Sequence, residues 1–135
     1  YNIDSAAKRV LEESGYENIK YCGGCDYQSI PEVLSNYDIG LVIYKPFSQN
    51  TIHAVSNKVF EYLACGLDVW FSEDMTYTFE YERKDVFPKV IAVNFKELNS
   101  FDYDSAISRK GLQYEPGNFF YQEVYGELLN EVLKS

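Results

Sequence analysis

The feature that most constrains the fold is a near-continuous apolar segment, residues 39–44, followed by a polar loop and a helix-forming segment at residues 57–64. An apolar run that does not alternate with polar residues is typical of a strand covered on both faces, as in a parallel sheet. Ser56 is a suitable N-cap for the helix that follows, and Gly66 is a suitable C-terminal stop. These segments therefore predict a strand–loop–helix unit of a parallel α/β sheet.

Similar signals predict alternating helices and strands along the rest of the chain. On the amino-terminal side they predict a helix from Asp4 or Ser5 to Gly15, a strand at 19–22 and a helix capped by Ser29. On the carboxy-terminal side they predict strands at 69–71 and 90–93, helical turns near 76–82, 95–98 and 105–108, and a helix at 119–133. This alternation predicts a Rossmann-like, doubly wound parallel sheet in a single α/β domain. Since no strand precedes the first helix, we expect the domain to be truncated at its N-terminus.

Composition narrows the classes of partner. The chain has 135 residues, enough for one domain with a core, and a formal net charge of −9. That charge, without a run of lysine or arginine, disfavours nucleic-acid binding. No apolar stretch of about 18 residues is present, so the sequence predicts no membrane span, and it shows no signal peptide. The 13 tyrosines and 9 phenylalanines are expected mainly to fill the core and its rim.

The cysteines suggest no special chemistry. The odd number, three, argues against a disulfide framework and for a reducing compartment. Cys22 and Cys25 flank Gly23 and Gly24 in a C-x-x-C arrangement, but no helix opens directly behind the pair, as a redox pair would require. Zinc would need two further ligands. The favoured interpretation is a glycine turn between two unremarkable thiols, with no metal site.

Candidate binding residues gather where the predicted strand ends and the next helix begins. In α/β domains this edge of the sheet binds anionic ligands. Lys58 can meet a phosphate there, and Glu61 can accept hydrogen bonds from adjacent hydroxyls of a sugar. Tyr44 and Lys45 close the strand at the same edge. This pairing of charge and hydroxyl recognition predicts a nucleotide-sugar site, although a surface ion pair between Lys58 and Glu61 would explain both residues.

The same segments resemble a known enzyme family. Asp-Ile-Gly-Leu-Val-Ile-Tyr at 38–44 and Asn-Lys-Val-Phe-Glu-Tyr-Leu-Ala-Cys-Gly-Leu at 57–67 are similar to the donor-binding half of glycosyltransferases with the GT-B fold, in the manner of glycosyl transferase group 1. The resemblance covers residues 19–72, about 40% of the chain. It implies that residues 1–135 form the C-terminal nucleotide-sugar-binding domain of a larger two-domain enzyme.

The resemblance also implies roles for individual residues. In such enzymes the glutamate on this helix binds the ribose hydroxyls of the nucleotide, which places that role on Glu61. The first amides of the helix, at Val55, Ser56 and Asn57, would face the diphosphate, with Lys58 adding positive charge. Stabilising the departing nucleoside diphosphate in this way needs neither a metal nor a cofactor.

Further positions follow the family pattern or depart from it. Gly23 and Gly24 occupy the preceding loop, where backbone can approach the base. Many retaining members carry a second glutamate near the transferred sugar, eight residues before the first; here that position is His53, the candidate catalytic residue. Asp68 replaces a proline of the family pattern.

The resemblance finally implies a function for the whole enzyme. It would move a sugar from a nucleoside diphosphate to a hydroxyl acceptor, in polysaccharide or glycoconjugate synthesis. The acceptor would be held by an N-terminal domain of the same protein, so this chain alone is not expected to catalyse transfer. The expected location is the cytoplasm, and peripheral association of the full-length enzyme with the inner face of the membrane is compatible with the family.

Two other functions fit the same pattern. A nucleotide-sugar epimerase of the same fold would share the donor site. A non-catalytic partner-binding α/β module would keep the sheet and bind no nucleotide. A response-regulator receiver is disfavoured, because such domains need an acidic cluster at the strand ends, and the strand here ends in Tyr44 and Lys45.

Overall fold

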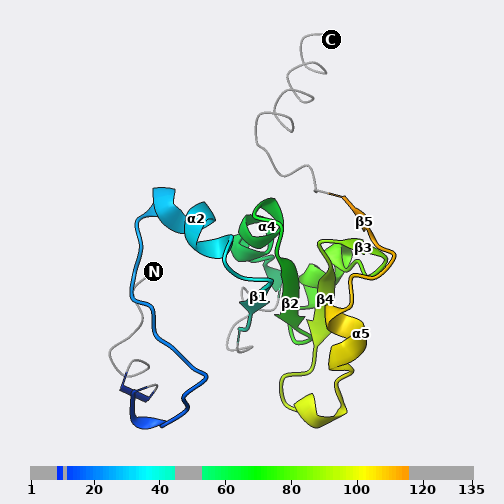
Figure 1. Ribbon diagram of the computed structural model, residues 1–135. Helices are drawn as coiled ribbons and strands as arrows, with labels where there is room; N and C mark the ends of the chain where they lie inside the picture. The colour runs from blue at the N-terminus through cyan, green and yellow to red at the C-terminus, as the bar shows by residue number, and fades with distance from the viewer. Residues whose placement is uncertain (1–8, 11, 45–52, 116–135) are drawn as a thin grey trace. The chain divides into compact units, whose positions relative to one another are not determined.

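The computed structural model describes residues 9–10, 12–44 and 53–115 (Figure 1). The chain divides into two compact units, residues 1–33 and residues 34–135. The predicted helix at 119–133 and the predicted caps Asp4 and Ser5 lie outside the described residues. No helix in the described part of the chain is both long enough and apolar enough to cross a bilayer.

The first unit contains helical backbone but not the predicted strand. Residues 9–10 and 12–13 are helical, and Gly15 adopts a φ of 67°, as expected of a residue that follows a helix. The strand predicted at 19–22 is wrong, because these residues have no regular secondary structure and pair with no strand in the described part of the chain. Ile19 and Tyr21 are exposed there, so the apolar signal does not correspond to burial.

The helix predicted after Ser29 forms, but its start differs. A 3₁₀ turn, η1 (Tyr27–Ser29), follows Asp26 and leads directly into α2 (Ile30–Leu34). The amide of Ser29 donates to the carbonyl of Asp26, so Ser29 lies inside the turn rather than capping the helix. Glu32 lies in the first turn of α2, where its charge favours the helix dipole.

The second unit is built on a parallel sheet of three strands, β1 (Ile39–Val42), β2 (Asp68–Ser72) and β4 (Val90–Val93). The strand order is β1-β2-β4, so the sheet grows in sequence order with β2 in the middle (Figure 1). Gly40 is aligned with Val69 between β1 and β2, and Val69 is aligned with Val90 between β2 and β4. Parallel neighbours require crossovers, and α4 supplies the first of them.

Helix α4 (Asn57–Ala64) has the predicted bounds. The Ser56 hydroxyl accepts a hydrogen bond from the Lys58 amide at 3.3 Å, which satisfies one of the donors that a helix leaves unpaired at its start. Gly66 has a φ of 78°, which a residue with a side chain rarely adopts, and its amide donates to the Leu63 carbonyl. The strand–loop–helix unit predicted from the sequence is therefore confirmed in its helical part.

Alternate residues of the strands build two apolar clusters on opposite faces of the sheet. The cluster beneath α4 consists of Val42, Val59, Leu63, Val69, Phe71, Met75 and Val90. The cluster on the other face consists of Trp70, Ile91, Val93 and Ala106, the last from α5 (Tyr103–Ile107). The Trp70 ring meets Phe101 edge-on at 5.1 Å between centroids. Every residue of β2 is buried, as the central position of this strand requires.

Strand β1 is covered on one face only, so the expectation of two covered faces is wrong for it. Val42 points into the cluster beneath α4, whereas Leu41 and Ile43 retain 49% and 53% of their surface exposed. Ile39 alone reaches the second cluster. An apolar run cannot distinguish a central strand from an edge strand, and β1 is the edge strand of this sheet.

The segment after β2 contains short elements that the sequence predicts only in part. The 3₁₀ helix η2 (Thr76–Tyr81) matches the predicted turn at 76–82, and α5 lies near the predicted turn at 105–108. The turn predicted at 95–98 is displaced to η3 (Leu98–Ser100). Two unpredicted strands, β3 (Val86–Phe87) and β5 (Gln113–Tyr114), form a separate parallel pair. The fold is thus mixed α/β, with a three-stranded parallel sheet and a second two-stranded one.

A buried carboxylate connects the amino-terminal ends of these strands. Asp68, only 1% exposed, begins β2. One of its oxygens accepts the Lys89 amide at 2.6 Å, and the other accepts Arg109 Nε at 3.2 Å. Arg109 also donates to the Asp38 carbonyl at 3.1 Å, and its guanidinium lies 4.0 Å from the centre of the Phe87 ring. Asp68 therefore joins the chain before β4 and the chain after α5 to the start of β2.

Lys89 completes this connection with its side chain. The residue is 3% exposed, and its ammonium donates to the carbonyls of Ser105 at 3.1 Å and Ser108 at 2.7 Å, with Ala106 as a third acceptor. These carbonyls lie at the C-terminal end of α5, where a positive charge is favourable. The buried ammonium is thus compensated by three acceptors, and it fixes α5 against the sheet.

The buried connection gives a first prediction. We expect Asp68→Ala to lower the free energy of unfolding by about 3 kcal/mol, because it leaves a buried amide and a guanidinium edge without their acceptor. Urea denaturation measures the change. The control is Asp74→Ala, which removes a more exposed ion pair with Lys96 and is expected to cost less than about 1 kcal/mol. Equal losses in both variants would show that Asp68 is not a special anchor.

Gly40 gives a second prediction. A Cβ at this position would overlap the ring of Tyr62, because β1 and α4 approach closely there. We expect Gly40→Ala to cost about 1–3 kcal/mol of unfolding free energy, the usual penalty for overpacking. In a Tyr62→Leu background the same substitution is expected to cost much less, since the clashing ring is gone. A double-mutant cycle by thermal or urea unfolding measures this coupling, and strict additivity would contradict the close approach.

Candidate functional site

Polar side chains meet at the carboxyl end of β1 and the first turn of α4. Tyr44 follows β1, and its hydroxyl lies 3.3 Å from the Ser56 hydroxyl, with either oxygen able to donate. Ser56 also caps α4 by accepting the Lys58 amide. A single serine therefore joins the end of the strand to the start of the helix. Tyr44 and Ser56, which the sequence placed at this edge separately, are in direct contact.

Lys58 and Glu61 lie on the same side of α4. Lys58 Nζ is 4.0 Å from Glu61 Oε2, and the two side chains are 27% and 29% exposed. An ion pair at that distance, partly open to water, contributes little to stability. Both charges are held beside the N-terminal turn of the helix while remaining accessible. The arrangement fits a structural surface pair and equally fits two groups available to a ligand that separates them.

His53 lies against an aromatic residue that the sequence analysis did not select. Its ring meets Tyr77 edge-on, with centroids 5.2 Å apart. Tyr77 belongs to η2, which follows the carboxyl end of β2, and Tyr81 of the same element meets Phe60 of α4 at 5.1 Å. The η2 segment thus borders both His53 and α4. Its sequence signal was the run of aromatic residues at 77, 79 and 81, but the run alone does not tell which element it lies against.

The other predicted residues differ in how they relate to this edge. Val55 is partly buried and packs on the cluster beneath α4, so its side chain is part of the core. Asn57, the first residue of α4, is exposed. Lys45 lies outside the described residues. Gly23 and Gly24 belong to the first unit, and Gly23 has a φ of 83°, which a turn requires.

The pKa of the Cys65 thiol is raised by its surroundings, which include Glu61. Burial raises the pKa of the Cys65 thiol, and the negative charge of Glu61 raises this pKa further. The Cys65 amide also donates to the Glu61 carbonyl at 3.2 Å, so the two residues are fixed relative to each other at the end of α4. The thiol is therefore protonated at neutral pH and is a poor nucleophile.

The cysteines and the possible metal ligands were also located in the described part of the chain. All three cysteines lie in the described part of the chain, and none forms a disulfide; Cys22 and Cys25 are exposed. Across residues 9–10, 12–44 and 53–115, no group of three histidine, cysteine or acidic residues is placed to hold a metal ion.

Comparisons of the chain with family models, with curated proteins and with solved structures find no match. The residues at the carboxyl end of β1 and the start of α4, and the resemblance of their motifs, are therefore the only indications of a function.

The thiol environment gives a third prediction. In variants that keep one cysteine each, we expect Cys65 to be alkylated by iodoacetamide at pH 8 at least about threefold more slowly than the exposed Cys22 or Cys25, because it is partly buried and its thiol pKa is raised. Adding Glu61→Gln should speed the alkylation of Cys65, since a negative charge that raises its pKa is removed. Mass spectrometry follows the rates. A Cys65 rate that does not respond to Glu61→Gln would contradict the electrostatic contact.

Proposed function

We propose that the chain is the nucleotide-sugar donor-binding domain of a GT-B glycosyltransferase, with a Rossmann-like, doubly wound sheet. The observation that supports this most is the meeting of Tyr44, Ser56, Lys58 and Glu61 at the carboxyl end of a parallel strand. Ligands of open α/β sheets bind outside the carboxyl ends of the strands. The motifs at 38–44 and 57–67, which carry the resemblance, supply these residues.

In the proposed complex the two charges of α4 act on different parts of the donor. Glu61 accepts two hydrogen bonds from the ribose hydroxyls, and Lys58 faces the diphosphate together with the first amides of the helix. At 4.0 Å their mutual ion pair is a weak one. Fixed donors that stabilise the departing diphosphate supply the electrostatic part of catalysis.

His53 is the proposed contact to the transferred sugar. Its ring makes an edge-on contact with Tyr77, a residue of the 3₁₀ helix η2 that also contacts α4 through Tyr81. An imidazole can donate or accept a hydrogen bond but does not offer the fixed negative charge of the glutamate found here in many retaining relatives. The proposal therefore assigns His53 to orienting the sugar.

The whole enzyme would transfer a sugar from a nucleoside diphosphate to a hydroxyl acceptor, in polysaccharide or glycoconjugate synthesis. The acceptor would bind to a separate N-terminal domain, and closure of the two domains would exclude water from the reacting centre.

A partner-binding module is the second candidate, and one observation favours it. Leu41 of β1 and Ile43, which follows the strand directly, are both about half exposed. An apolar surface of this kind is typical of a contact with another protein element. Such a module would bind no nucleotide, so a nucleotide titration distinguishes it from a donor-binding domain.

A titration with UDP, GDP, ADP and CMP gives the fourth prediction. One diphosphate should bind saturably and shift the amide resonances of residues 55–61. We expect Glu61→Ala to weaken that binding by about 1–3 kcal/mol, the range for lost charge-assisted hydrogen bonds. Calorimetry and amide NMR are the measurements.

Glu97→Ala is the control, because Glu97 is exposed at the start of η3 and lies outside the candidate site. Its nucleotide affinity should equal that of the unmodified chain. Unchanged affinity in a folded Glu61→Ala variant would remove Glu61 from the site. Failure of all four nucleotides to bind, here and to the full-length protein, would favour the partner-binding module.

A further inference from the structure

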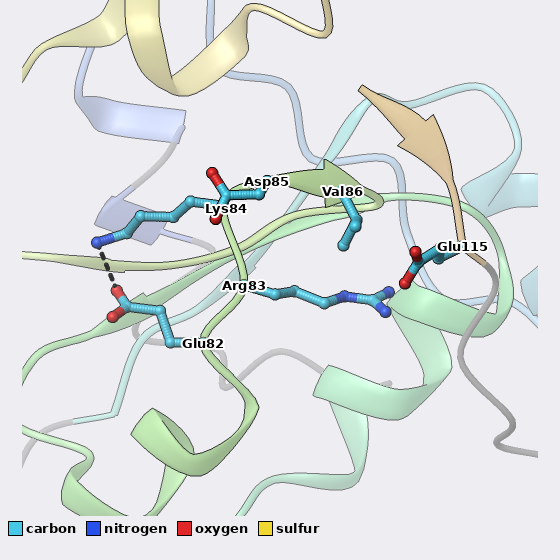
Figure 2. A pocket seen from close by; sticks show the side chains of 6 residues that line it. All are labelled: Glu82, Arg83, Lys84, Asp85, Val86 and Glu115. Carbon is cyan, nitrogen blue, oxygen red and sulfur yellow. Dashed lines mark ion pairs between the residues drawn. The ribbon is translucent and has the colours of Figure 1, made fainter. Parts of the chain in front are cut away.

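A polar cleft in the second unit directs its charges toward one another. Its volume is about 500 Å³, and Figure 2 shows the side chains that line it: Glu82, Arg83, Lys84, Asp85, Val86 and Glu115. Lys84 Nζ pairs with Glu82 at 3.0 Å, and the guanidinium of Arg83 extends toward the carboxylate of Glu115 (Figure 2). The Nε and Nη2 atoms of Arg83 are buried, so a ligand in the cleft does not reach them. We assign no ligand to this cleft.

A pair of exposed thiols in the first unit is a different case. Cys22 and Cys25 are both exposed, and neither takes part in a disulfide. Residues 19–26 have no regular secondary structure, so no helix or strand holds the segment that carries the two thiols. Reagents in solution can therefore reach both sulfur atoms, which is the first requirement for thiol–disulfide exchange.

The two residues between the cysteines allow the sulfur atoms to meet. A disulfide requires Cα atoms about 4.4–6.8 Å apart, so the chain must turn between the two cysteines before the bond can form. Gly23 already has a φ of 83°, and a Cβ on it would meet no other atom within 4 Å. Gly24 follows directly. Adjacent glycines can adopt the backbone angles of tight turns without steric cost, and the space around Gly23 is open.

Forming this turn disrupts few existing interactions. Gly23, Gly24 and Cys25 make no backbone hydrogen bond to another described residue. The Cys22 thiol donates to the Lys20 carbonyl at 3.9 Å, and a thiol is a weak donor. Since only two residues separate the cysteines, each thiol is present at a high effective concentration near the other.

The position of the pair distinguishes reversible oxidation from redox catalysis. A catalytic pair opens a helix directly, whereas Asp26 separates Cys25 from η1, which begins at Tyr27. The pair therefore lacks the placement of an enzyme that oxidises other proteins. Its exposure and its glycines instead suit a site that is itself oxidised and reduced.

We propose that Cys22 and Cys25 form a reversible dithiol–disulfide couple that exchanges with low-molecular-weight disulfides. The thiolate of one cysteine attacks a sulfur of the small disulfide, whose S–S bond breaks, and one small thiol leaves. The thiolate of the other cysteine then attacks the protein sulfur of this mixed disulfide and displaces the second small thiol. Each attacking thiol gives its proton to water, and each leaving thiolate takes one up. Two protein thiols are thus oxidised, and one small disulfide is reduced to two thiols.

Cys65 is the internal control for this reaction. It is partly buried, and burial and the charge of Glu61 raise the pKa of its thiol. A smaller fraction of it is therefore the thiolate that exchange requires. It also has no second cysteine within three residues of it in the sequence. We expect it to stay a thiol under conditions that oxidise half of the Cys22–Cys25 pair.

The test equilibrates the reduced chain with mixtures of glutathione and glutathione disulfide, without oxygen and with EDTA present. The remaining thiols are blocked with N-ethylmaleimide, and mass spectrometry of the digested chain locates each disulfide. The main oxidised product should be the Cys22–Cys25 disulfide. The equilibrium constant of the exchange has the units of a concentration, and we expect at least about 10 mM, in the range for short flexible connections.

Variants and a matched control locate the reaction. Cys22→Ser and Cys25→Ser should each stop at a mixed disulfide with one glutathione, because the second attacking thiol is gone. Cys65→Ser should leave the equilibrium constant unchanged. Replacing Gly23 and Gly24 together by valine should lower it at least about threefold, because β-branched residues are stiff and favour an extended chain.

Several outcomes would overturn the proposal. These are mixed disulfides that accumulate in place of the Cys22–Cys25 bond, a main product that includes Cys65 or joins two chains, or an equilibrium constant below about 10 mM. An equilibrium constant that the two valines do not change would contradict the role given to the glycines. No nucleotide takes part in this test, so its result leaves the donor-site proposal as it stands.

Discussion

The second unit depends on the hydrogen bonds accepted by one buried carboxylate. Asp68 begins the central strand, and the groups that it binds belong to the chain before β4 and the chain after α5. Lys89, whose amide is one of these groups, sends its ammonium to the carbonyls at the end of α5. Asp68 and Lys89 thus connect the start of β2 to the chain before β4 and to the end of α5. Arg109, held by Asp68, also reaches the Asp38 carbonyl just before β1.

Local signals predicted the parts of the fold that local interactions determine. Ser56 and Gly66 gave the bounds of α4, because a capping hydroxyl and a positive φ act within one turn of the helix. The apolar runs gave β2 and β4 but not the open face of β1, since the position of a strand in a sheet depends on the rest of the chain. The strand predicted at 19–22 failed for the same reason. The two-residue strands β3 and β5 have no periodicity from which to predict them.

The candidate site shows the same division. Tyr44, Ser56, Lys58 and Glu61 were predictable because one strand–loop–helix unit carries all four. Tyr77 was not, because its contact with His53 joins two segments that are distant in the sequence.

The tryptophan on the second face of the sheet has a practical consequence for studying the protein. Trp70 is the only tryptophan in the chain and lies buried against Phe101, on the face covered by α5 rather than by α4. Its indole Nε1 has no hydrogen-bond partner among the described residues. Because Ile91, Val93 and Ala106 form the cluster around it, we expect the emission of Trp70 to report on the packing between the sheet and α5.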